Sequence, residues 1–200
     1  MRAYLAAPGP SVTVIFQPEN KGPHQVFLDP ANLALLPQFF CITDPDLLLN
    51  PAMPEDFLAQ LAAVTERLTV GKAGLAIDIA DHSALRQEDF LINDRLWKIW
   101  EWEEQFWREP LEPLQGGDPV FRADIDTTFA LYNKRFFNAD DQAKAVRVAG
   151  RYTCRHLPWY KDVGLPPEEE RYYRSHSRDS YYLRDDVADP ASSPGCELRG

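Results

Sequence analysis

The sequence has 200 residues, of which 44% are hydrophobic, 12% aromatic and 26% charged, and its formal net charge is −10. This composition is too apolar for a disordered chain, and the length favours one hydrophobic core. The negative charge argues against non-specific binding to nucleic acid or to anionic membranes, because both attract positive protein surfaces.

The chain shows no stretch of about 20 apolar residues and no apolar core of a signal peptide, so we expect neither a membrane anchor nor export. Cys41, Cys154 and Cys196 are scattered and fit neither a disulfide framework nor a CxxC zinc site. A reducing cytoplasm is the location that these features predict.

The first 43 residues are predicted to be β-rich. Residues 11–17 and 24–29 are short β-prone runs, and the turn-rich segment 18–23 between them could close an antiparallel hairpin. Residues 39–42 form a brief apolar run that could add a strand.

Helical patterns dominate from residue 54 onward. Residues 54–70 carry apolar side chains on one face after Pro54, which suits the first helical position. The run 75–79 fits a buried strand or a helical turn. The longest predicted helix starts at Asp81 or Ser83 and extends to about Arg108, where Pro110 stops it.

Three further helices follow in the prediction. One begins at Asp118 and extends through Phe136, one runs from Asn138 to about His156, and the last starts at the acidic segment after Pro166. The predicted fold is therefore α+β and helix-dominant, with four or five helices and a small N-terminal antiparallel hairpin or sheet. We expect one domain over residues 1–186, helical over 54–184, and a flexible tail at 187–200.

The predicted helix 81–108 contains four of the five tryptophans and has apolar residues on more than one side. Such a helix is either buried between two layers or presents its second face to a partner. Aromatic anchors with a polar rim are the usual layout of an interface. The candidate partner-binding residues are Phe90, Asp94, Trp97, Glu101, Trp102 and Glu104, whose acidic rim would favour a basic partner.

Glu103 is a candidate general acid or base. It projects between Ile99 and Phe106 on the main apolar stripe of the predicted helix, where burial would raise its pKa. The alternative is that this helix end is exposed and Glu103 has no catalytic role.

Asp124 to Thr128 read DIDTT, which matches the pattern DxDxT. The pattern resembles the first motif of haloacid-dehalogenase-like phosphatases, in which one Asp attacks phosphate and the other handles the leaving group's proton. The resemblance implies catalytic roles for Asp124 and Asp126, with Lys161 and the pair 185–186 as the other charged groups. It covers five residues, and here helical periodicity replaces the family's hydrophobic strand. The alternative is two solvated helix acids.

The segment from Arg171 to Arg184 interleaves cations with tyrosines, as anion-binding sites often do. Acidic neighbours leave this segment without a positive excess, so salt bridges to the acidic body are the alternative interpretation. The candidate anion-binding residues are Arg171, Arg174, Arg178 and Arg184.

The four histidines show no recognised metal-binding spacing, and no nucleotide-binding, serine-hydrolase or calcium-binding motif occurs, so we predict no metal and no cofactor. The nearest approaches to a ligand pair are Asp81–His82 and Cys154–Arg155–His156. Either pair could become a site if the fold added a third group.

The sequence as a whole predicts a non-catalytic, acidic protein-binding protein, such as an inhibitor, an immunity-type protein or a chaperone, which engages a basic partner. The first alternative is a small hydrolase or transferase acting on a phosphorylated or other anionic substrate. The second is a subunit of a larger assembly.

Overall fold

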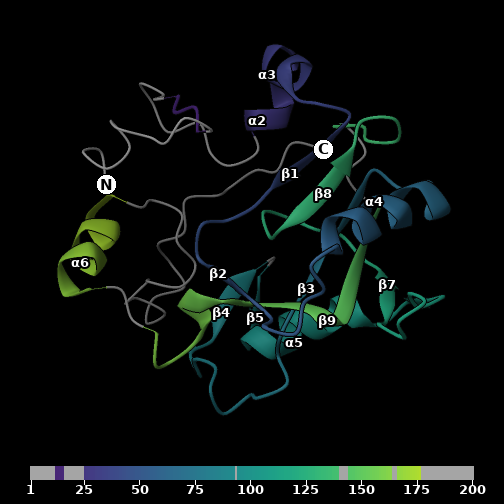
Figure 1. Ribbon diagram of the computed structural model, residues 1–200. Coiled ribbons are helices and arrows are strands. Elements are labelled where there is room, and N and C mark those ends of the chain that lie inside the picture. The colour runs from purple at the N-terminus through teal and green to yellow at the C-terminus, as the bar shows by residue number, and fades with distance from the viewer. Residues whose placement is uncertain (1–11, 16–24, 93, 140–143, 164–165, 177–200) are drawn as a thin grey trace.

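The computed structural model describes residues 12–15, 25–92, 94–139, 144–163 and 166–176. In this part of the chain, seven strands form one mixed sheet in the order β1-β8-β3-β9-β7-β6, with β2 paired to β9 (Figure 1). The helix-dominant prediction is therefore wrong. The strands are β1 Phe39–Ile42, β2 Leu47–Leu49, β3 Lys72–Ile77, β6 Pro110–Leu111, β7 Val120–Arg122, β8 Ala130–Asn133 and β9 Ala145–His156.

Strands β3 and β9 form the centre of the sheet. They run parallel, whereas β1, β2, β6, β7 and β8 pair in antiparallel ladders. All six residues of β3 are buried, and so are the first five of β9. The β3–β9 register shifts after Leu75, because β9 bulges at Gly150, whose φ of +67° suits a residue without a side chain.

Helix α4, Phe57–Leu68, confirms the helix predicted over residues 54–70. It buries Leu61, Val64 and Thr65 and ends where Thr69 turns left-handed at φ 55°. The remaining helical elements are short or lie near the end of the described chain: α2 Gln25–Leu28, α3 Pro30–Leu35, α5 Ile99–Glu103, the 3-10 helices η1 Glu104–Trp107 and η2 Leu157–Trp159, and α6 Pro167–His176. Among the described residues, none of these helices is long and apolar enough to cross a bilayer.

The longest predicted helix, 81–108, is mostly wrong. Its middle forms a hairpin of β4, Phe90–Ile92, and β5, Arg95–Trp97, and only its end is helical, in α5 and η1. Apolar residues three and four positions apart fit a helix, but they also fit two short strands joined by a tight turn.

Two further predicted helices are strands. The segment 118–136 contains β7 and β8 joined by a loop, and 138–156 contains β9. The first five residues of β9 are buried consecutively, and from Arg151 onward buried and more exposed side chains alternate. The sequence shows this alternation at residues 151–155, but the small residues 149–150 also fit the face of a helix, which the prediction followed. The partners of β9 lie far away along the chain, and their pairing outweighs local propensity.

The N-terminal prediction is confirmed only in part. Residues 39–42 form β1 as predicted, but residues 25–28 form α2 and not a strand. The open segment 75–79 contributes its first three residues to β3. Most of the predicted hairpin turn and the predicted tail 187–200 lie outside the described residues.

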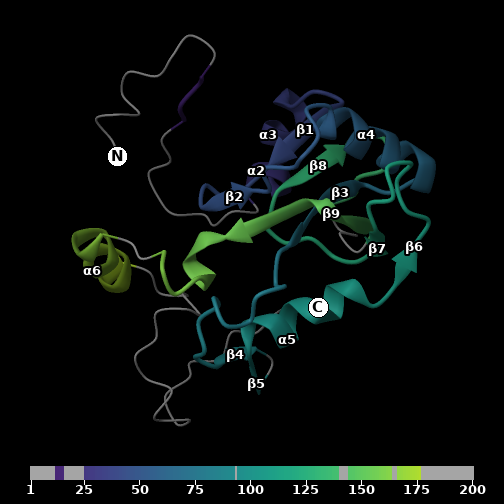
Figure 2. The same cartoon turned by 60° about the horizontal axis from the view of Figure 1, so that its bottom comes forward.

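The elements gather at two ends of the sheet. Helices α2 and α3 lie beside β1 and β8, whereas the β4–β5 hairpin and α5 lie together at the opposite end (Figure 2). A large core includes Leu61, Leu75 and Val148, and a second cluster of buried residues around Phe40 and Tyr132 packs beneath α2 and α3.

Candidate functional site

The β4–β5 hairpin has two different faces. Phe90 pairs with Trp97 and both turn toward Trp102, at ring-centroid distances of 6.3 and 5.5 Å. Leu91 pairs with Leu96 on the opposite face, because neighbouring residues of a strand point to opposite sides. These two leucines are 41% and 49% exposed, and with Asp94 at the turn they form what we call the hairpin face.

On the hairpin, the alternation of strand residues decides which side chains reach the surface. The other candidate partner-binding residues, Glu101, Trp102 and Glu104, lie on α5 and η1. Phe90 is buried, Trp97 and Trp102 are half-buried, and Asp94, Glu101 and Glu104 are exposed. Leu91 and Leu96 were missed, because the helical interpretation placed Leu96 on the main apolar stripe, which was expected to be buried, and Leu91 on no apolar face. The sequence held a signal for them: Asn93-Asp94 between apolar runs is a typical hairpin turn, and Asp94 adopts a left-handed φ of 59°.

Charge around the hairpin is strongly negative. Between residues 88 and 104 the sequence has six acids and two bases. Lys98, one of the bases, binds the Asp89 carboxylate and the carbonyl of Gln87, and the guanidinium of Arg95 lies 3.7 Å from the centre of the Trp97 ring. The outward leucines therefore lie among exposed carboxylates, with the nearby cations engaged by neighbours.

Glu103 is buried, which is one of the two alternatives that the sequence left open. Its Oε2 accepts a 2.8 Å hydrogen bond from Nη1 of Arg147, and both side chains are 4% exposed. Burial raises the pKa of Glu103, although the charge of Arg147 opposes the shift. Arg147 also donates to the carbonyl of Asp124 and lies over the Phe106 ring, so this pair connects α5, η1 and β9 in the interior.

Asp124 and Asp126 lie in the loop between β7 and β8, and both are exposed. Strand β7 precedes them where helical periodicity was expected. The buried cations Lys72 and Arg147 lie near this loop, whereas Nζ of the expected Lys161 donates to the carbonyl of Ser83. Burial lowers the pKa of Lys72 against the two carboxylates, and its Nζ donates 2.8 Å to the carbonyl of Ile125. Lys72 therefore fixes the backbone of this loop.

The Arg-rich segment is described only in part. Arg171 lies exposed on α6, and the side chain of Arg174 is outside the description. Arg178 and Arg184 lie outside the described residues. The structure does not bring any described member of this group to Glu103 or to the loop of Asp124.

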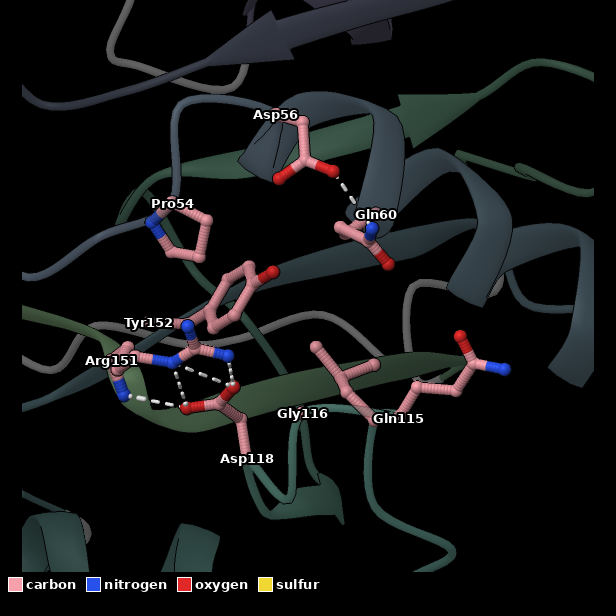
Figure 3. A pocket seen from close by; sticks show the side chains of 9 residues that line it. Pro54, Asp56, Gln60, Gln115, Gly116, Asp118, Arg151 and Tyr152 are labelled. Atoms are coloured by element: carbon pink, nitrogen blue, oxygen red, sulfur yellow. Dashed lines mark hydrogen bonds and ion pairs between the residues drawn. The ribbon is translucent and has the colours of Figure 1, made fainter.

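A polar pocket of about 140 Å³ lies between the start of α4, the turn before β7 and the bulge of β9 (Figure 3). Arg151 on this bulge donates two hydrogen bonds to Oδ2 of Asp118, at 2.7 and 3.1 Å, and the backbone N–H of Arg151 donates 2.8 Å to Oδ1. The Asp118 carboxylate therefore already binds the Arg151 guanidinium, and an anionic ligand of Arg151 would have to displace Asp118. We assign the pair a structural role, which is to hold the bulge against the turn.

A second, larger cavity of about 370 Å³ borders β2 and the far half of β9. Its lining includes the apolar Leu48 and Leu49 and the Arg155–Asp78 ion pair, with an N–O distance of 3.5 Å. Neither this cavity nor the polar pocket contains Glu103, Asp124 or Asp126.

The described residues that could hold a metal ion are Asp44, Asp46 and His156, whose ligand atoms lie within 4.8 Å of one another. The sequence indicated only His156, in its pairing with Cys154. The two aspartates are more than a hundred positions away, so no short motif could have joined them to it.

Comparison with known proteins finds no matching family model, no similar curated protein and no similar solved structure.

Proposed function

We propose that this protein is an acidic, non-catalytic binding protein that engages a basic protein partner through the hairpin face. The observation that carries the proposal is the outward pair Leu91–Leu96. These side chains lie on a hairpin that joins no strand of the seven-stranded sheet in the described part of the chain. Exposed apolar residues with a polar rim are the usual core of an interface.

The hairpin is built to present that face. A two-stranded hairpin is only marginally stable by itself, and here the contacts of Phe90 and Trp97 with Trp102 hold it to the body. Phe90 and Trp97 thus attach the hairpin to the body of the protein, while the exposed Leu91 and Leu96 could contact a partner. Since Phe90 is buried and contacts Trp102, as Trp97 does, we expect the hairpin to bind without a large change of its own shape.

Charge indicates the class of partner. The chain has a net charge of −10, and acids outnumber bases around the hairpin. A second copy of the same chain would bring like charges together, whereas a basic partner would be attracted over a distance of about 10 Å at ordinary ionic strength. We therefore favour a basic partner over self-association.

The test is affinity capture from a lysate of the source cells, with the double variant Leu91→Ser/Leu96→Ser beside the wild type. Leu58→Ser is the matched control, because Leu58 is similarly exposed, at 42%, but lies on α4. We expect a basic protein to be retained by the wild type and the control, to elute with salt, and to be lost from the double variant.

Both variants should keep their free energy of unfolding within about 0.5 kcal/mol of the wild type, because the replaced side chains are exposed. Equal retention of the same protein by the double variant and the wild type would refute the hairpin face as the binding surface. An acidic retained protein, or one that resists salt, would refute the charge argument.

A further inference from the structure

Three side chains from two separate parts of the chain meet beside the end of β9. Asp44 and Asp46 lie between β1 and β2, and His156 is the last residue of β9. The antiparallel pairing of β2 with β9 opposes Leu47 to His156, and the N–H of Leu157 donates 2.9 Å to the carbonyl of Asp46. Backbone pairing thus places two carboxylates beside one imidazole.

The spacing suits a single ion. One ligand atom from each side chain falls within 4.8 Å of the other two, so one cation at ordinary bonding distances of about 2.0–2.3 Å could contact all three after small adjustments. Thr127 fixes one of these ligands in advance, because its hydroxyl donates a 2.7 Å hydrogen bond to Oδ2 of Asp44.

One carboxylate oxygen of the cluster is covered. Oδ1 of Asp46 has almost no contact with solvent, although the Asp46 side chain as a whole is 40% exposed. Nε2 of His156 faces this oxygen at 3.4 Å, which is an ion pair only while the imidazole is protonated. Covering a carboxylate oxygen in this way costs free energy, and a bound cation would offset that cost.

The local charge also calls for a cation. Asp44 and Asp46 place two carboxylates beside the single imidazole of His156, and Thr127, which binds Asp44, follows a third acid, Asp126, in the chain. A divalent ion would remove the repulsion between these like charges.

We propose that Asp44, Asp46 and His156 bind a divalent transition-metal ion, for which Zn²⁺ is the best match. Two carboxylates and one imidazole suit Zn²⁺ or Mn²⁺ better than Ca²⁺ or Mg²⁺, which prefer oxygen ligands alone. The ligand atoms that lie together are those of Asp44, Asp46 and His156, and the nearby Cys154 thiol is not among them. The site is independent of the hairpin face and joins the segment before β2 to β9.

The experiment is calorimetric titration of ZnCl₂ into the full chain, without an affinity tag and after treatment with a chelator. We expect one Zn²⁺ per chain, with a dissociation constant of about 10 µM or tighter, and binding of MgCl₂ at least about tenfold weaker. Asp46→Asn and His156→Gln should each weaken Zn²⁺ binding by about tenfold or more. His82→Gln is the control and should bind as the wild type does, because His82 stacks on Trp100 outside the cluster.

The proposal is overturned if the wild type binds no Zn²⁺ below about 100 µM, or if Asp46→Asn and His156→Gln bind like His82→Gln. Circular dichroism will show whether each variant keeps its fold. If the variants unfold, the wild type decides the question by NMR with Mn²⁺. The paramagnetic ion must broaden the signals of His156 and of Trp159, whose ring lies 4.9 Å away, before those of His82. Equal broadening at His82 and His156 would overturn the proposal.

Discussion

Two arginines on β9 each hold a carboxylate, and they do so in opposite environments. Arg147 and Glu103 are both buried, whereas Arg151 is about half exposed beside the buried Asp118. Burial raises the pKa of Glu103 in spite of its partner. At Asp118 burial acts in the same direction, but the hydrogen bonds from Arg151 outweigh it and the pKa is lowered. Contact with arginine therefore does not by itself make a carboxylate a stabilising group.

The two pairs differ in what each replaces. Glu103 and Arg147 both gave up water, and their attraction has to offset two desolvation costs. In the second pair only Asp118 is shielded from water, because Arg151 stays about half exposed. The Asp118 carboxylate accepts hydrogen bonds from the backbone N–H and from the guanidinium of Arg151. We expect the loss of one partner of the Glu103–Arg147 pair to lower the free energy of unfolding strongly, and replacement of both partners to lower it little. We expect Asp118 to stabilise the fold mainly through its hydrogen bond with the backbone N–H of Arg151.

The largest effect should come from breaking the interior pair. Glu103→Gln leaves the charge of Arg147 buried without its counter-ion, and we expect a loss of about 3–5 kcal/mol in the free energy of unfolding. Urea denaturation followed by circular dichroism measures this loss. The double variant Glu103→Leu/Arg147→Met should recover most of it, because it removes both charges. A single variant as stable as the wild type would show that the pair is not desolvated.

Gly150→Ala should have the next largest effect. A Cβ at this position would meet Oδ1 of Asp118 at 2.7 Å, and the φ of +67° would be strained for any other residue. We expect a loss of about 2 kcal/mol. Gly117→Ala is the matched control: its φ is +84°, but its Cβ would meet nothing within 4 Å, so only the strain of about 1 kcal/mol remains. Equal losses in the free energy of unfolding of the two variants would show that the contact with Asp118 does not contribute to the effect of Gly150→Ala.

Asp118→Ala should have the smallest effect, and its effect should depend on pH. At neutral pH we expect a loss of about 1–2 kcal/mol, because the N–H of Arg151 loses its acceptor. The lowered pKa means that the carboxylate stabilises the fold above the pKa of an unfolded Asp, about 4, and that this stabilisation is lost as the pH falls through the lower folded-state value. Urea denaturation of wild type and variant at pH 7 and pH 3 should show the difference shrinking. A constant difference would contradict the assignment.

The sequence predicted those elements whose stability is local. Helix α4 has a helix start at Pro54 and one apolar face, and β1 is a short apolar run, so neighbouring residues suffice to define both. Strand β9 was missed because the small residues around its bulge also fit a helix face and outweighed the alternation at residues 151–155. Its partners β3 and β7 lie elsewhere in the chain, so no local pattern could show the pairing.

The candidate sites divide along the same line. The sequence left open whether Glu103 is buried on the apolar stripe or exposed at a helix end, and the structure buries it. Leu91 and Leu96 were hidden by the wrong prediction of a helix, since a helical period and a strand period turn different residues outward. The meeting of Asp44 and Asp46 with His156 depends on the register of β2 with β9, which no local pattern contains.

The position of β9 has a consequence for how this chain is made. β7 and β2 join the sheet through β9, and β6 joins it through β7, while β9 itself pairs with β3 across the whole intervening segment of hairpin, helix and strands. During synthesis by the ribosome, β2, β3 and β7 emerge before β9, and their edges that will pair with β9 stay unpaired until β9 has emerged. Pairing between such distant segments predicts folding on the order of milliseconds to seconds after release, and a growing chain that is prone to aggregate until residue 156 has emerged.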